Sequence, residues 1–386
     1  MKKLIIVLAL LTVFSVLVFA GGEQEGTGTK TETEGSADSM YDIDAPSSKT
    51  SIDVIGWAFP ITEFYAKEFK KLNAVENLEV NTQLLASSDA QEQVRLALSG
   101  GTESPYEIVH AANTQIAEWG HPGWLLPLND LVEKYWDEYN LGDIPETSWE
   151  AATVNGNIVG VPAVANGFQL IYRKDLFEKH GIEVPQTFDA VIAAAQKLKG
   201  DPEIEVPFVI NLHAGWAWEI EFFQMLRGFG GKYFNDDNTA AFNGPEGVAA
   251  IEKIMEVAEK AIGELGMSYS VDDLEIGLQT GRLAFANTWA SRAVNMKNPE
   301  KSAYAEELAF APSPAAEPGG PLIASAWNDF YCIPKNAGVD PELIFQVIME
   351  TIDLESQLEA VEHGIPTRAE ALKSDKAGAY MPAVSV

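Results

Sequence analysis

Predicted strands and helices alternate along most of this chain, and this order is what most restricts the possible fold. Segments 52–55, 78–84 and 106–111 have the apolar or alternating pattern of strands, and 61–72 has helical spacing. A further helix is predicted between the capping signal at Ser88 and the glycine pair that begins at Gly100. Strands separated by crossover helices are parallel, so this part is predicted to be an α/β unit.

A second set of elements follows a hairpin signal at Asn155-Gly156. Strands are predicted at 169–172 and 208–211, with a helix at 188–198 between them. A chain of 386 residues is long enough for two domains. The sequence therefore predicts two α/β lobes, with a ligand held between them at the ends of the strands.

The N-terminal 50 residues do not have the pattern of a folded domain. Residues 1–20 combine two lysines, an apolar run and a small-residue cleavage site, which predicts a secretory signal peptide. The alternative, an uncleaved anchor, needs a longer apolar run. Residues 21–50 are rich in Gly, Glu, Thr and Ser and are predicted to be a disordered linker. Gly21 occupies the place where a lipid anchor requires Cys, so a periplasmic or extracellular protein, not a lipoprotein, is expected.

Composition excludes several classes of function. The formal net charge of −31 opposes binding to nucleic acid. The five histidines show no metal-ligand spacing, and no phosphate-binding glycine loop or nucleophile motif occurs. Cys332, the only cysteine, is expected to be packed in the core. No metal, cofactor or catalytic residue is predicted.

Several short motifs occur in a fixed order between residues 52 and 372. They include GVP at 160–162, YRKDLF at 172–177 and PQTFD at 185–189, together with LLPLND at 125–130, GRLAF at 281–285 and APSP at 311–314. In this set the chain resembles the extracellular solute-binding proteins of sugar ABC importers, the maltodextrin-binding-like family. Arg173 is a departure, because the family usually has Asn there.

The resemblance implies a periplasmic-binding-protein fold with an interlobe cleft and three hinge crossings, near 161–166, 278–286 and 323–331. Lobe 1 would comprise 51–163 plus 280–324, and lobe 2 would comprise 164–279 plus 325–386, with a short C-terminal part. Closure of the lobes would trap a small carbohydrate or related polar solute, and the closed form would engage the permease subunits of an ABC importer. A monomer without enzymatic activity is expected.

Aromatic and planar polar side chains that follow predicted strands or lie at the crossings are the candidate ligand-binding residues. Aromatic faces pack on the C–H surfaces of sugars, and amides and carboxylates bind hydroxyls. The candidates are Trp57, Phe59, Asp89, Asn113, Asn166, Trp216, Trp218, Trp289, Arg292, Trp327, Asn328 and Asp329. Each also has an ordinary structural interpretation, such as core packing for a Trp or helix capping for Asp89.

Three other functions remain open at this point, and one of them is a tethered interaction protein whose cleft binds no ligand. The ligand could be an amino acid, a polyamine or an organic acid, although only one arginine, Arg292, falls at a predicted cleft position. A secreted glycoside hydrolase would need two carboxylates facing each other across a sugar bond, and acidic residues are plentiful here.

Overall fold

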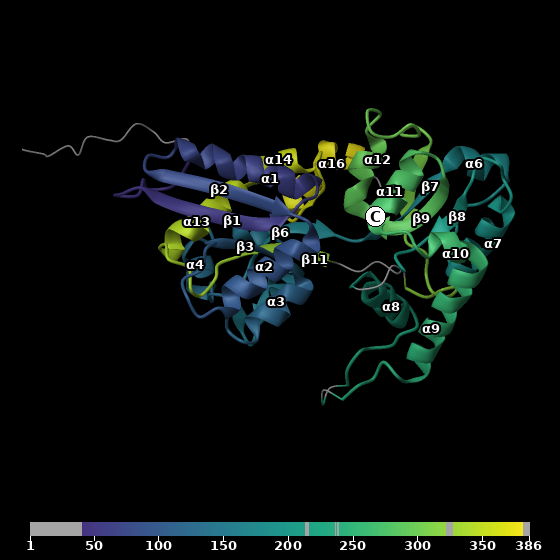
Figure 1. The fold of residues 1–386 in the computed structure, drawn as a ribbon, viewed down its shortest axis with the longest axis horizontal. Coiled ribbons are helices and arrows are strands. Elements are labelled where there is room, and N and C mark those ends of the chain that lie inside the picture. Colours follow the sequence, from purple (N-terminus) through teal and green to yellow (C-terminus); the bar gives the residue numbers. More distant parts are fainter. Residues whose placement is uncertain (1–40, 213–215, 236, 238, 322–326, 381–386) are drawn as a thin grey trace, which may run out of the picture. The chain divides into compact units, whose positions relative to one another are not determined.

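Two separate sheets, each with its own hydrophobic core, organise the chain (Figure 1). The computed structural model describes residues 41–212, 216–235, 237, 239–321 and 327–380. The predicted signal peptide at 1–20 and residues 21–40 of the predicted linker lie outside the described residues. Residues 41–49 contradict the linker prediction, because Ile43 is buried in the first core and Tyr41 packs against it.

The first sheet has six strands in the order β12-β6-β11-β3-β1-β2. β1 pairs in parallel with β2 and β3, as the alternating pattern predicted, whereas β11 is antiparallel to both β3 and β6. The strands are β1 (Thr50–Trp57), β2 (Leu78–Leu85), β3 (Ile108–Ala112), β6 (Val161–Asn166), β11 (Trp327–Cys332) and β12 (Ile365–Pro366).

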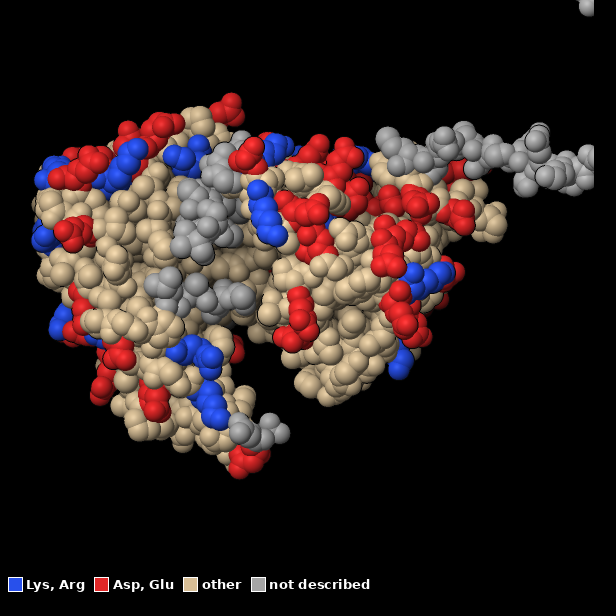
Figure 2. All heavy atoms as spheres, turned by 180° about the vertical axis from the view of Figure 1, so that it is seen from behind, with Lys and Arg blue, Asp and Glu red and all other residues tan. Residues whose placement is uncertain are grey.

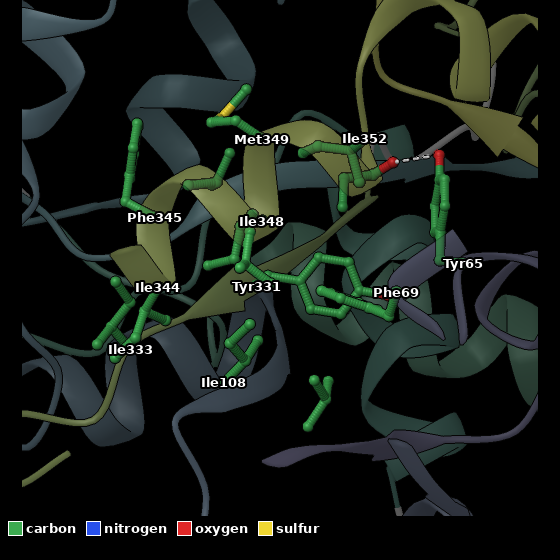
Figure 3. Close-up of a cluster of buried hydrophobic side chains, with 14 of the residues drawn as sticks. Tyr65, Phe69, Ile108, Tyr331, Ile333, Ile344, Phe345, Ile348, Met349 and Ile352 are labelled. Atoms are coloured by element: carbon green, nitrogen blue, oxygen red, sulfur yellow. Dashed lines mark hydrogen bonds between the residues drawn. The ribbon is translucent and has the colours of Figure 1, made fainter. Parts of the chain in front are cut away.

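Helices cover both faces of this sheet (Figure 1). Alternate residues of a strand point to opposite faces, so Tyr331 packs under α1 and α13 while Phe330 and Cys332 pack under α2 and α3. Figure 3 shows the first of these cores, where the Phe69 and Tyr331 rings meet edge to face with centroids 5.1 Å apart. The helices of this lobe are α1 (Pro60–Lys71), α2 (Ser87–Ser99), α3 (Asn113–Gly120), α4 (Asn129–Lys134), α5 (Glu146–Ala151), α13 (Pro341–Thr351), α14 (Leu354–Ala360), α15 (Ala369–Leu372) and α16 (Asp375–Tyr380).

The second sheet has four strands in the order β10-β7-β9-β8. β9 is parallel to β8 and antiparallel to β7. The strands are β7 (Phe168–Arg173), β8 (Val206–Val209), β9 (Leu283–Trp289) and β10 (Leu308–Pro312), and the helices are α6 (Lys174–Lys179), α7 (Phe188–Leu198), α8 (Trp216–Gly228), α9 (Pro245–Val257), α10 (Gly263–Gly266), α11 (Val271–Gln279) and α12 (Ala293–Lys297). The predicted Asn155-Gly156 hairpin is confirmed as β4 (Thr153–Val154) and β5 (Asn157–Ile158), with both turn residues at positive φ.

The pairings correct the expected lobe boundaries. Segment 280–324 was assigned to the first lobe, yet β9 and β10 belong to the second sheet, and segment 325–386 was assigned to the second lobe, yet β11 and β12 belong to the first sheet. The expected crossing at 278–286 is wrong for the same reason, because Leu278 and Leu283 pack in one core with Leu274. A buried strand pattern does not state which sheet the strand joins. We call the first sheet with its helices the first lobe and the second sheet with its helices the second lobe.

Between the described strands, the chain passes from one sheet to the other at Gly167 and again between β10 and β11. Residues 322–326 of that second passage, part of the expected 323–331 crossing, lie outside the described residues. The C-terminal helices add a packing contact between the lobes, since Ala290 is buried with Val361, Ala371 and Ala377.

Candidate functional site

A cavity of about 630 Å³ is lined by side chains of both lobes. From the first lobe come residues at the ends of β1 and β3, the start of β11, and the first turns of α2 and α3. From the second lobe come residues after β8, at the end of β9, and on α8 and α11. The volume falls within the usual range for sites that bind small molecules.

Aromatic rings form three parts of the cavity lining. Trp57, the last residue of β1, stacks on the buried His110 with ring centroids 3.7 Å apart. Trp289 of the second lobe and Trp327 of the first meet edge to face at 5.8 Å, so this pair spans the two lobes. Phe223 stacks on Tyr233 at 5.4 Å on the second lobe. Such faces suit the C–H surface of a sugar or polyol.

Amides and hydroxyls line the first-lobe side between α2 and α3. Gln91 donates to Ser87 Oγ at 2.9 Å and accepts from Gln115 Nε2 at 3.2 Å, while Gln115 Oε1 accepts from the backbone of Ala112. The network fixes these planar amides at the cavity wall, because each restrains the next. It is neutral and offers both donors and acceptors.

Asp329 lies on the first-lobe wall of the cavity and is buried. Its Oδ2 lies 3.4 Å from His110 Nε2, which is long for a hydrogen bond. Its Oδ1 has no hydrogen-bond partner in the protein. His110 is held in place by Trp57 on one side and by Gly56, where an added Cβ would come within 3.0 Å of the His110 Cβ.

Asn211 lies on the second-lobe wall of the cavity. Its backbone and side-chain nitrogens both donate to Glu221 Oε1, at 2.9 and 3.3 Å, and its Oδ1 has no partner. Burial raises the pKa of Glu221 from 4.5 to about 8, an increase that the two hydrogen bonds from Asn211 reduce. Glu221 therefore stays largely protonated near neutral pH.

Arg292 is the only Lys or Arg among the described residues that line the cavity, and it is already engaged by carboxylates. Its Nη1 donates to Asp272 Oδ1 at 2.7 Å and to Glu275 Oε2 at 2.6 Å. The cation is thus balanced within the protein and does not provide a free positive charge for an anionic ligand.

Asn166 marks the first passage between the lobes. Its Oδ1 accepts from the backbone nitrogens of Gly167 and Ser291, and its Nδ2 donates to Ser291 Oγ at 3.0 Å. One amide side chain therefore ties the end of β6 to the turn after β9, next to the cavity.

The structure brings part of the sequence-predicted set together on the cavity: Trp57, Phe59, Asn166, Trp289, Arg292, Trp327 and Asp329. Other members have roles away from it. Asn113 Oδ1 accepts from the Asn328 backbone, and Asn328 Oδ1 accepts from Ser148, so both stabilise the scaffold. Trp218 packs against the second-lobe core, and Asp89 is exposed in the first turn of α2 and is not on the lining. The side chain of Trp216 lies outside the described residues.

Several lining residues were not predicted from the sequence: Ser87, Gln91, Gln115, Asn211, Glu219, Phe223, Tyr233, Ser270 and Asp272. Asn211 had a usable signal, because it is the last residue of the predicted strand 208–211, and the end of a predicted strand is also where Trp57 lies. The helical residues had none, since a polar residue on a helix resembles any solvated position.

Acidic side chains outnumber basic ones on the face shown in Figure 2, in line with the net charge of −31. Among residues 41–380, outside the short gaps in the description, no group of His, Cys, Asp and Glu is arranged to hold a metal ion. None of the described helices has the length and apolar character of a membrane span.

Known proteins resemble this chain in sequence. The family model for bacterial extracellular solute-binding proteins matches residues 58–342. A mannitol-binding protein of Pseudomonas aeruginosa is 25% identical over 239 residues, which cover 60% of this chain and 52% of that protein. An uncharacterised ABC transporter extracellular-binding protein of Pyrococcus horikoshii is 32% identical over 133 residues, covering 34% of this chain and 30% of the relative. The chain thus spans about half or less of the length of these relatives.

Solved structures share the fold over most of the chain. A ribitol complex of an ABC transporter solute-binding protein from Agrobacterium radiobacter matches with a TM-score of 0.78 and 19% identity, covering 88% of this chain and 86% of that one. A maltose-bound protein of T. maritima matches with a TM-score of 0.75 and 22% identity, covering 86% and 85%. The two-lobed α/β architecture and the family match over 58–342 agree, and the chain belongs to the family of bacterial extracellular solute-binding proteins.

Proposed function

We propose that this protein is the receptor component of an ABC-type importer and that it captures a small, neutral, polyhydroxylated solute, a sugar or sugar alcohol. The observation that carries the proposal is the composition of the cavity: aromatic faces on both lobes beside a neutral wall of hydroxyls and amides. C–H surfaces and hydroxyl groups alternate around a sugar or polyol, so such a ligand needs both kinds of contact.

Charge argues against an anionic ligand. Arg292 is held by two carboxylates, and Glu219 and Asp329 also line the cavity. An organic acid or phosphorylated sugar would bring a negative charge next to these carboxylates, and the described part of the lining offers no free Lys or Arg to bind it. The names of the similar proteins support the same class, since they include a mannitol-binding protein and complexes with ribitol and maltose.

Capture by closure follows from the position of the cavity between the lobes. Ligand contacts from both lobes favour the closed state by their differential affinity, which is how a ligand shifts such an equilibrium. The importer's permease subunits would recognise the closed form. The predicted signal peptide would export the protein to the side of the membrane where the solute arrives.

A binding protein, and not a glycoside hydrolase, fits the carboxylates of the cavity best. Asp272 is engaged by Arg292, and Asp329 is buried beside His110. A hydrolase requires one carboxyl to protonate the leaving oxygen and a second to act on the opposite face of the ring. The family of the chain is a family of binding proteins.

The test is a thermal-shift and calorimetric screen of the purified protein. D-mannitol, ribitol, D-tagatose and maltose form the test set, and L-amino acids, citrate and spermidine form the comparison set. A ligand at a hundred times its Kd stabilises the folded state by about 2.7 kcal/mol, which a melting curve detects readily. Binding confined to the comparison set refutes the proposal, as does release of hydrolysis products from maltose.

A further inference from the structure

Helix α9 of the second lobe carries two apolar stripes, and the described part of the protein covers only one of them. The buried stripe packs in the second-lobe core and consists of Ala250, Ile254 and Val257. The other stripe consists of Val248, Ile251 and Met255. Val248 is 53% and Met255 63% exposed, whereas an apolar helix face of this kind is usually buried. Figure 1 shows α9 at the outer edge of the second lobe, where a partner can reach it.

The exposed stripe has the residue spacing of a surface on which helices pair. Val248, Ile251 and Met255 are separated by three and four residues, as positions a, d and a of a heptad are. In this register Glu252 and Glu259 occupy the flanking e positions, and both are exposed. Flanking charges of this kind determine which partner helix is accepted. We call these five residues the α9 seam.

The charges around the α9 seam are paired on one side and unpaired on the other. Lys253 and Lys260 both donate to Glu256, at 2.7 and 2.9 Å, so these cations are neutralised within the lobe. Among the described residues, no Lys, Arg or His forms an ion pair with Glu252 or Glu259. The flank of the seam is therefore negative and can bind cations supplied from outside.

We propose that the α9 seam is a docking surface for a basic amphipathic helix of another protein. Apolar residues of that helix pack on Val248, Ile251 and Met255, and its Lys or Arg residues face the two glutamates. A second copy of this chain is disfavoured, because it brings the same carboxylates and a formal net charge of −31 to the contact. No residue of α9 is among the described residues that line the cavity, so docking and solute binding are separate.

The first experiment uses a labelled synthetic helix of about three heptads, with Leu at positions a and d and Lys at e and g. One comparison peptide has Glu in place of Lys, and another has the residues of the basic helix in scrambled order. Fluorescence anisotropy gives the Kd of each peptide for the whole protein. We expect the basic helix to bind at least about tenfold more tightly than either comparison peptide. The scrambled peptide keeps the charge, so it measures unspecific attraction to an acidic protein.

Matched variants then locate the contact. Met255→Ser removes an exposed apolar side chain from the seam, and Leu96→Ser removes one that is 56% exposed on α2 of the first lobe. Met255→Ser should weaken binding of the basic helix at least about tenfold, and Leu96→Ser less than about twofold. Glu252→Lys should weaken the basic helix and strengthen the Glu peptide, because it reverses a flanking charge. Equal effects of the two serine variants, equal binding of the scrambled peptide, or no binding at all overturns the inference.

Two further measurements identify the occupant and separate the seam from the cavity. Sedimentation equilibrium of the protein alone should give a monomer, and a dimer that Met255→Ser dissociates would make a second copy the occupant and overturn the inference. The Kd of D-mannitol, ribitol or maltose should not change at a saturating concentration of the basic helix, and competition between the two would show that the sites are not separate. If none of these solutes binds, the proposed function fails while the peptide results still decide the inference.

Discussion

The buried carboxyl of Glu221 makes the stability of this protein depend on pH in a way that one substitution should remove. Its pKa is raised from 4.5 to about 8 by burial on α8, where it faces Asn211. Between those pH values the folded protein keeps a proton that the unfolded chain has released. The contribution of Glu221 to the free energy of unfolding is therefore fully present below about pH 4.5 and is lost as pH rises through about 8.

The expected size of this loss follows from the shift. Each pH unit inside the window lowers the free energy of unfolding by about 1.4 kcal/mol, so that the contribution between pH 5 and pH 8 is on the order of 4 kcal/mol. Glu221→Gln has nearly the same shape, keeps the oxygen that accepts from Asn211, and does not ionise. The variant should match wild type near pH 5 and exceed it increasingly up to pH 8.

Urea denaturation followed by tryptophan fluorescence at pH 5, 6, 7 and 8 measures this difference, because the midpoint and slope give the free energy of unfolding at each pH. Burial also raises the pKa of Glu107 and Glu350, but these contribute equally to both proteins and cancel. Glu219→Gln, an exposed carboxyl on the same helix, is the control and should leave the pH profile unchanged. A constant difference between Glu221→Gln and wild type across pH would refute the reasoning.

Three further substitutions separate the cavity from the scaffold. Trp327→Ala should weaken sugar or polyol binding more than about tenfold without unfolding the protein, because the ring lines the cavity beside Trp289. Trp136→Ala removes an exposed ring away from the cavity and should leave the Kd measured by calorimetry unchanged. Arg368→Met should lower stability by about 3 kcal/mol and leave the Kd unchanged, since the buried guanidinium donates to the carbonyls of Ile352 and Asn140; a normal urea midpoint would contradict this. Gly160→Ala should cost about 1–3 kcal/mol in the same assay, because a Cβ there would lie 2.9 Å from Cys332 Sγ; a gain in stability would show that the core can adjust.

The structure explains why Arg173 stands where the family usually has Asn. The sequence indicated only that this residue differs from the family pattern. In the structure the guanidinium is buried, donates to both oxygens of Asp175, and lies 3.7 Å from the centre of the Tyr304 ring. Gly281 makes room for that ring, since a Cβ there would come within 2.2 Å of it. The arginine thus joins three distant segments of the second lobe.

What the sequence determined by itself was the local structure and its class. Apolar periodicity identified β1, β2, β3 and their crossover helices, and Asn155-Gly156 identified a hairpin, because these features depend on neighbours along the chain. The ends of strands also indicated the aromatic part of the cavity, since a residue that follows a parallel strand lies at the ligand edge of the sheet. Trp57 and Trp289 were found in this way.

The tertiary structure decided which strands share a sheet and which polar groups face one another. A buried strand such as β9 would have the same residue pattern in either sheet. Only its hydrogen-bond pairing with β7 and β8 assigns it to the second sheet. The role of Asn211 depends on Glu221 ten residues away, and that of Asp329 on His110 in another strand. Whether a polar atom is satisfied depends on contacts between distant segments, and the order of residues along one segment does not contain that information.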